Sequence, residues 1–196
     1  MKKFLSLLLA VVMCTAMLVG CGSGNNSGGS GNSNPGSGAS SGSGDTLIIR
    51  EQGDPMSFNP SLAADDMLYD AAQNMFHRLT CLDASKQVIP EAAESWEVSD
   101  DALTITFHLK DKLKWTDGEA LDAEDVKYTF DYIKEHPDCY FSSSMSIVDS
   151  IEVVDPLTVV FHMNTADMSF VARIGWYGTF ILPEHVFNNG QTWSEN

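Results

Sequence analysis

The strongest constraint on folding is a run of 23 residues, 22–44, that consists almost entirely of Gly, Ser and Asn. Its only other residues are Pro35 and Ala39, so no side chain in it is large enough to build a hydrophobic core. Such a segment cannot recover the entropy lost on ordering, and we expect a flexible tether. Its expected end-to-end distance is about 25–30 Å. Folding is therefore confined to residues 45–196, enough chain for one modest domain.

Residues 1–20 have the composition of an export signal. Lys2 and Lys3 precede an apolar stretch from Phe4 to Val19, which is followed by the small residue Gly20. The stretch is short for a membrane-spanning helix, and no stop-transfer charges follow it. This order predicts a signal peptide over residues 1–20.

Cys21 comes directly after this stretch, at the end of the segment Leu18–Cys21. The segment resembles the lipobox of bacterial lipoproteins, in which the cysteine thiol is acylated and becomes the new N-terminus. The resemblance implies lipid attachment at Cys21, and several acyl chains on one residue hold a protein on a membrane far better than one. The alternative is an ordinary secretory signal with an incidental cysteine.

The chain is strongly acidic, with 11 Lys and Arg against 27 Asp and Glu and a formal net charge of −16. Removing residues 1–20 takes away two lysines and no acid, so the charge of the remainder becomes −18. Nucleic acids and anionic bilayers would both repel such a body. We therefore expect no nucleic-acid partner, and we expect membrane association to depend on the lipid at Cys21.

Residues 45–196 alternate between strand and helix patterns. Strand patterns occur at residues 46–50, 103–109, 151–154 and 158–163, and helical patterns at residues 67–79, 123–135 and between Pro183 and Phe187. Apolar residues occur at every second position of the strand pattern at 103–109. One face of this strand therefore carries Leu103, Ile105, Phe107 and Leu109. The helical pattern at 123–135 has an acidic first turn and ends before Pro137. We expect its inward side chains to be Val126, Phe130 and Ile133. This interleaving predicts a mixed α/β or α+β class.

Residues that could carry chemistry show no catalytic or metal-binding pattern. Cys81 and Cys139 lack metal-ligand spacing, and either a disulfide or two free thiols would fit. The histidines are scattered without an HExxH motif, and no GxSxG, Walker loop or GxGxxG is present. Trp176 and Tyr177 could stack on a sugar or peptide, although packing in a core or hairpin is favoured. We expect no catalytic residue, no metal and no cofactor.

Several motifs together resemble one family, the family 5 extracellular solute-binding proteins. Residues 53–60 read GDPMSFNP, similar to the family's opening DPxxLDP. Its longer signature resembles the sequences IPEAAESWEVSDD at 89–101, LTITFHLK at 103–110, KWTDGE at 114–119 and LDAEDV at 121–126. The sequence VVDPLTV at 153–159 is similar to its later hairpin. Departures from the pattern are Asn59, Ala92 and Ala120.

The resemblance implies the first lobe of a two-lobed, class II periplasmic-binding-protein-like fold. It also implies a function: a monomeric, lipid-anchored, extracytoplasmic receptor that passes a peptide or similar small solute to an ABC permease and its ATPase subunits. The resemblance also implies that the segment just after Pro60 contacts the ligand. In this sequence those residues are Ala64, Asp65 and Asp66. Those residues could add backbone hydrogen bonds to an extended peptide, or meet a cationic side chain. Alternatively, the two aspartates simply begin the following helix.

The domain division that follows is residues 1–20 as signal peptide, 21–44 as lipidated cysteine and tether, and 45–196 as the N-terminal part of a solute-binding domain. The resemblance implies that the second lobe is missing, either because the chain is a fragment or because the gene is truncated. A single lobe exposes half a cleft, so we expect it to bind weakly or not at all. Alternative functions are an exported enzyme such as a glycosidase, or a non-functional truncated receptor.

Overall fold

The computed structural model describes residues 48–55, 57–62, 66–176 and 179–188. The elements below belong to one unit, residues 49–196. Within the described ranges, every helix is too short or too polar to span a bilayer.

A four-stranded antiparallel sheet forms the centre of the fold, in the strand order β3-β4-β6-β5. Its strands are β3 (Ala93–Val98), β4 (Thr104–Leu109), β5 (Val148–Asp155) and β6 (Thr158–Met163). β4 pairs with β6 rather than with the next strand in sequence, and Ile105 lies opposite Phe161. A separate antiparallel hairpin consists of β1 (Thr80–Leu82) and β2 (Val88–Pro90).

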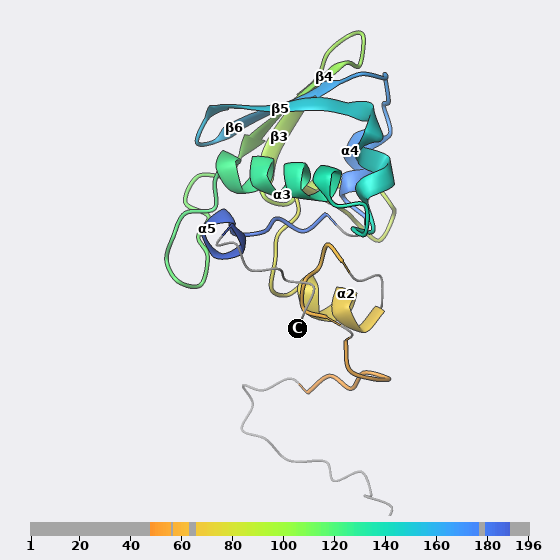
Figure 1. Cartoon of the computed structure of the whole chain (residues 1–196), viewed down its shortest axis with the longest axis vertical. Coiled ribbons are helices and arrows are strands. Elements are labelled where there is room, and N and C mark those ends of the chain that lie inside the picture. The colour runs from red at the N-terminus through yellow and green to blue at the C-terminus, as the bar shows by residue number, and fades with distance from the viewer. Residues whose placement is uncertain (1–47, 56, 63–65, 177–178, 189–196) are drawn as a thin grey trace, which may run out of the picture. The chain divides into compact units, whose positions relative to one another are not determined.

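Helix α3 (Ala123–Glu135) lies across one face of this sheet (Figure 1). Local sequence explains both of its ends. Asp122 accepts a hydrogen bond from the amide of Glu124 and forms a capping box with Asp125, which satisfies free N–H groups of the first turn. The helix ends at Glu135, two residues before Pro137, as the sequence predicts.

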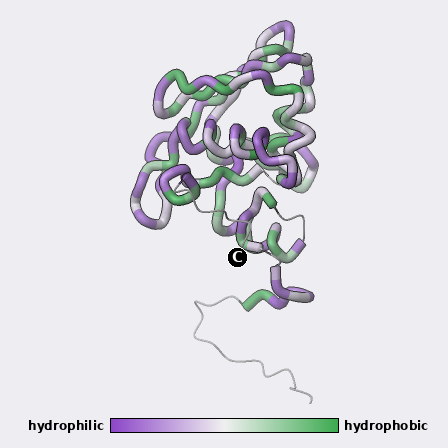
Figure 2. Tube along the Cα trace, in the orientation of Figure 1, coloured by the Kyte–Doolittle hydropathy of each residue, from purple (hydrophilic) through white to green (hydrophobic). Residues whose placement is uncertain are grey.

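The hydrophobic core lies between α3 and the sheet. Phe130 of α3 meets Phe161 of β6 edge to face, with ring centroids 5.0 Å apart. Phe107 and Phe170 also contact Phe161, at 5.5 and 5.8 Å. The predicted inward residues of α3 and three of the four of strand 103–109 are buried, whereas Leu103 is exposed. Hydrophobic and hydrophilic residues are mixed along the chain around the sheet, while many of the loops are hydrophilic (Figure 2).

Four short helical segments complete the described fold: α2 (Asp66–Ala72), η2 (Ser142–Ile147), α4 (Phe170–Ile174) and α5 (Glu184–Phe187). α2 packs against a smaller apolar cluster, in which Leu68 and Ala72 contact Phe180. The segment 179–182 that leads to α5 is buried but is not a strand. The predicted short helix after Pro183 is confirmed.

Two sequence predictions are wrong in extent. Residues 48–50 do not form a strand, and Ile49 is exposed; residues 46–47 lie outside the described ranges. A strand needs a hydrogen-bonded neighbour, and none of the described strands pairs with this segment.

The helix expected at 67–79 ends at Ala72. There the amide of Asn74 bonds to Ala71 in a tight turn, and the Asn74 side chain bonds to the carbonyl of Asp70.

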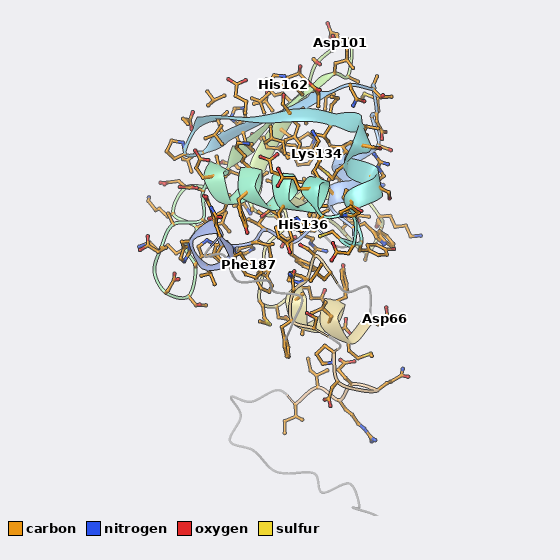
Figure 3. All side chains as sticks on the ribbon, in the orientation of Figure 1. Asp66, Asp101, Lys134, His136, His162 and Phe187 are labelled. Carbon is orange, nitrogen blue, oxygen red and sulfur yellow. The ribbon has the colours of Figure 1, made fainter. Side chains whose placement is uncertain are left out.

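The family-like signature has structural roles. Gly118 has a φ of 98°, a left-handed conformation that a Cβ would disfavour, so the turn at Asp117–Gly118 requires glycine. Trp96 and Trp115 pack against the core from its edge. Asp101 projects from the loop between β3 and β4, where it accepts hydrogen bonds from Ser99 and Leu103 (Figure 3).

Cys81 and Cys139 are both free thiols, which settles the choice that the sequence left open. Cys139 is buried in the core beside α3. Burial, together with the nearby charge of Asp138, raises the pKa of the Cys139 thiol to about 12. We infer that this thiol is structural rather than reactive.

Candidate functional site

A cavity of about 570 Å³ opens beside α2, and we call it the α2 pocket. Three segments that are distant in sequence line it: α2, the β1–β2 hairpin with the residue Arg78 before it, and the end of α4. The lining residues are Asp66, Tyr69, Gln73, Arg78, Leu82, Asp83, Ala84, Lys86, Gly175 and Trp176. Its size is in the range of pockets that hold small molecules.

Arg78 joins the three segments through its guanidinium. Nε donates to Glu91 Oε2 at 3.0 Å, and Nη1 donates to the Tyr69 hydroxyl at 2.9 Å and to the Trp176 carbonyl at 3.3 Å. The Tyr69 hydroxyl also donates to the same carbonyl, at 3.3 Å. Arg78 is only 8% exposed although it lines the pocket. A buried cation is tolerated because Glu91 pairs with it.

The backbone around Arg78 is held equally firmly. The Arg78 amide donates to Glu91 Oε1, and its carbonyl accepts from the amide of Ala92. Burial opposes ionisation of Glu91, but hydrogen bonds from His77 and Arg78 and the charge of Arg78 lower the pKa of this carboxyl below its ordinary value. Glu91 is therefore ionised at neutral pH and holds Arg78 in place.

A close backbone approach brings Trp176 to the pocket. A Cβ on Gly175 would lie 2.9 Å from Thr80 Oγ1 and 3.3 Å from the Thr80 backbone, so only glycine fits where the end of α4 meets β1. Thr80 Oγ1 also donates to the carbonyl of Val171 in α4 at 3.0 Å. The next residue along the chain is Trp176, which is thereby placed at the pocket.

Trp176 is 55% exposed, so the favoured interpretation that it packs in a core or hairpin is wrong. The residues that this part of the chain contributes to the main core come from the preceding helix α4, namely Phe170, Val171 and Ile174. The ring is left free to stack on a ligand, the alternative considered from the sequence. Tyr177 lies outside the described residues.

The comparisons with known proteins identify the family. The family described as bacterial extracellular solute-binding proteins, family 5 Middle, matches residues 87–196, more than half of the chain. The chain belongs to this family. The resemblance drawn from the motifs is therefore confirmed.

Family 5 relatives are considerably longer than this chain. A dipeptide-binding protein of Escherichia coli is 32% identical over 149 residues, which covers 66% of this chain and 28% of the relative. The chain thus spans little more than a quarter of that protein.

Solved structures give the same picture. The dipeptide-binding protein of a Pseudoalteromonas species in complex with Met-Leu is similar with a TM-score of 0.63 and 25% identity, over 68% of this chain and 30% of that one. The oligopeptide-binding protein AppA of Bacillus subtilis, in complex with a nonapeptide, has a TM-score of 0.63 and 29% identity over 71% of this chain and 28% of that one. The fold prediction, a mixed α/β part of a periplasmic-binding-protein-like fold, is confirmed.

Only one residue of the predicted ligand-contact segment is described. Asp66 begins α2 and provides the acid of its first turn, as the helix interpretation expected (Figure 3). The same residue lines the α2 pocket, so the structure also leaves it available to a ligand. Ala64 and Asp65 lie outside the described residues, and so does Cys21.

Sequence reasoning missed Arg78, which we regard as the central residue of the pocket. Its partners are Glu91, 13 positions away, and the carbonyl of Trp176, 98 positions away. A lone arginine before a short strand carries no local pattern, so no sequence signal points to it. Within the described ranges, His, Cys, Asp and Glu side chains nowhere gather into a group of three that could hold a metal ion.

Proposed function

We propose that this chain is the solute-capturing part of an extracytoplasmic, lipid-anchored receptor, which delivers peptides to an ABC permease driven by ATPase subunits. Its task is capture rather than catalysis, as expected for a family of solute-binding proteins. The observation that carries the proposal is the α2 pocket, where the exposed ring of Trp176 stands beside a buried, oriented Arg78. The names of several relatives, which bind dipeptides, favour a peptide as the solute.

The groups that line the α2 pocket are suited to binding a peptide. An aromatic ring offers a stacking surface for a side chain, and the hydrogen-bonding groups around it can orient a peptide. The carboxylate of Asp66 favours a solute with a cationic side chain. In this proposal the chain consists of a signal peptide (1–20), a lipidated cysteine with its tether (21–44) and a solute-binding part (45–196). The receptor is a monomer.

A substitution at Asp66 tests the pocket as the binding site. We expect Asp66→Asn to weaken binding of the dipeptide Lys-Leu by about 1–2 kcal/mol, because a charge-assisted contact is lost, and to leave binding of Met-Leu almost unchanged. Chemical-shift titration at millimolar peptide would measure both affinities. Asp70→Asn is the matched control: it makes the same change on the same helix at a residue that does not line the α2 pocket.

If neither peptide shifts the resonances of the wild-type chain, the α2 pocket is not sufficient to bind a peptide in this chain by itself. Hydrolysis of a glycoside by the same protein would instead favour the alternative of an exported enzyme. Equal weakening by Asp66→Asn and Asp70→Asn would point to a general effect of net charge.

The anchor has its own test. We expect radiolabelled palmitate to be incorporated into the protein expressed in a bacterial host, and Cys21→Ser to abolish the label, because the proposed acylated thiol is removed. Cys81→Ser and Cys139→Ser are controls that should retain it, since neither follows a signal-like stretch. Label that persists in the Cys21 variant would contradict the proposal.

A further inference from the structure

We propose that Arg78 is the carboxylate-recognising residue of the α2 pocket, and that its Nη2 donates to a carboxylate of the bound solute. The inference rests on the proposed function, because it assigns the chemistry of the same pocket. The expected solute is a zwitterion, that is, a free amino acid or a peptide with an unblocked carboxyl group.

The hydrogen bonds of the guanidinium leave one edge available. An arginine presents donors on Nε, Nη1 and Nη2 in a rigid planar fork. Nε is used by Glu91, and Nη1 is used by the Tyr69 hydroxyl and the Trp176 carbonyl. Nη2 has no hydrogen-bond partner among the described residues.

Nη2 is not an enclosed polar atom that the packing has left unpaired. In the described part of the chain, the fully enclosed polar side-chain atoms without a partner are Asn59 Nδ2, Ser61 Oγ and Arg173 Nε. Nη2 is not among them, and Arg78 lines the α2 pocket. Since Nη2 is neither bonded nor fully enclosed and Arg78 lines the cavity, we infer that this edge of the guanidinium faces the cavity.

The guanidinium is also fixed before any solute arrives. Its central carbon lies 5.3 Å from the ring centroid of Phe180 and 5.9 Å from that of Tyr69. These rings hold the cation by cation–π attraction, while Glu91 fixes the opposite edge. A donor that is already oriented loses little entropy on binding, which strengthens the interaction with an acceptor.

The surrounding charges favour a zwitterion over a simple anion. Glu91 offsets much of the positive charge of Arg78, and Asp66 and Asp83 add two carboxylates to the pocket lining. Lys86 is exposed, so its charge is largely screened. A solute with one carboxylate at Arg78 and an ammonium group near the acids would match this arrangement.

The test compares a peptide acid with its amide. We expect wild-type protein to bind Met-Leu roughly tenfold more tightly than Met-Leu amide, because the charge-assisted hydrogen bond requires the carboxylate. Arg78→Lys should reduce this preference to about twofold, since lysine keeps the charge but lacks the fixed fork. Lys86→Gln is the matched control, because it removes an exposed cation from the same pocket and should leave the preference intact.

A second measurement does not depend on a folded Arg78 variant. In protein labelled with ¹⁵N-arginine, Met-Leu and acetate should each shift the Arg78 side-chain resonances of the wild type, and Met-Leu amide should shift them less at equal occupancy, because its carbonyl oxygen is a weaker acceptor than a carboxylate. Shifts with acetate but no binding of either peptide would support the inference and count against the proposed function.

Other results would overturn the inference alone. Equal affinity for acid and amide in the wild type would mean that Arg78 serves only to join α2, the hairpin and the end of α4. The same conclusion would follow if both ligands bind but neither moves the Arg78 resonances, or if Lys86→Gln abolishes the preference while Arg78→Lys preserves it.

Discussion

Replacement of Phe161 by alanine is expected to lower the free energy of unfolding by about 3–5 kcal/mol. Phe161 is 0% exposed and contacts the rings of Phe107, Phe130 and Phe170. The substitution removes a large buried side chain, leaves a cavity, and abolishes ring contacts worth about 0.5–1.5 kcal/mol each. Because a domain of this size is only marginally stable, such a loss could remove much of its stability.

Urea unfolding followed by far-UV circular dichroism would measure this change, with an unaltered dependence on urea concentration indicating an unchanged native state. Phe58→Ala is the matched control. Phe58 is 62% exposed, so its loss should change the stability by less than about 0.5 kcal/mol. Similar losses for the two variants would show that Phe161 is not at the centre of the core.

Removal of the Asp125 carboxylate should have the second largest effect, about 2–4 kcal/mol for Asp125→Ala. Asp125 is 4% exposed, and its two oxygens accept three hydrogen bonds: from Trp115 Nε1 at 2.9 Å, from the amide of Asp122 at 3.3 Å and from the amide of Glu184 at 2.8 Å. Alanine would leave three donors without an acceptor and would remove one half of the α3 capping box.

Chemical denaturation again provides the measurement, and Glu124→Ala is the control. Glu124 is the preceding residue in the same acidic turn, but its side chain is exposed. Its loss should lower the stability by less than about 0.5 kcal/mol. Asp125→Asn, which keeps one acceptor oxygen, should fall between the two. Equal effects of Asp125→Ala and Glu124→Ala would mean that only the first-turn charge matters.

These two residues differ in how far the sequence revealed them. The acidic first turn of 123–135 and its apolar spacing predicted α3 with its observed bounds, because capping and periodicity are local properties. The contacts of Asp125 with Trp115 and Glu184 were not predicted, because they span 10 and 59 positions of the chain. The sequence therefore identified Asp125 as part of a helix start but not as a connection between three segments.

Where local pattern and tertiary contacts disagreed, the contacts decided. The apolar stripe at 67–79 predicted a longer helix, but Leu79 is buried in the main core next to β1, while Leu68 belongs to a separate cluster with Phe180. One straight helix could not place Leu68 in its cluster and Leu79 in the main core at the same time. The helix therefore ends at Ala72 and the chain turns. Strand-like residues at 48–50 remained unpaired for a related reason: β pairing depends on a partner elsewhere in the chain.

The amino-acid sequence alone determined the family, the mixed α/β class, helix α3 and strand β6, and its motif at 153–159 predicted the hairpin that β5 and β6 form. It also brought Asp66 into consideration as a ligand contact. Tertiary structure alone decided that Trp176 is exposed, that Cys81 and Cys139 stay free, and that Arg78 presents one edge to a cavity. The physical reason is range: capping, turns and periodicity act over a few residues, whereas a pocket forms where distant segments meet, and its chemistry depends on which side chains remain unpaired there.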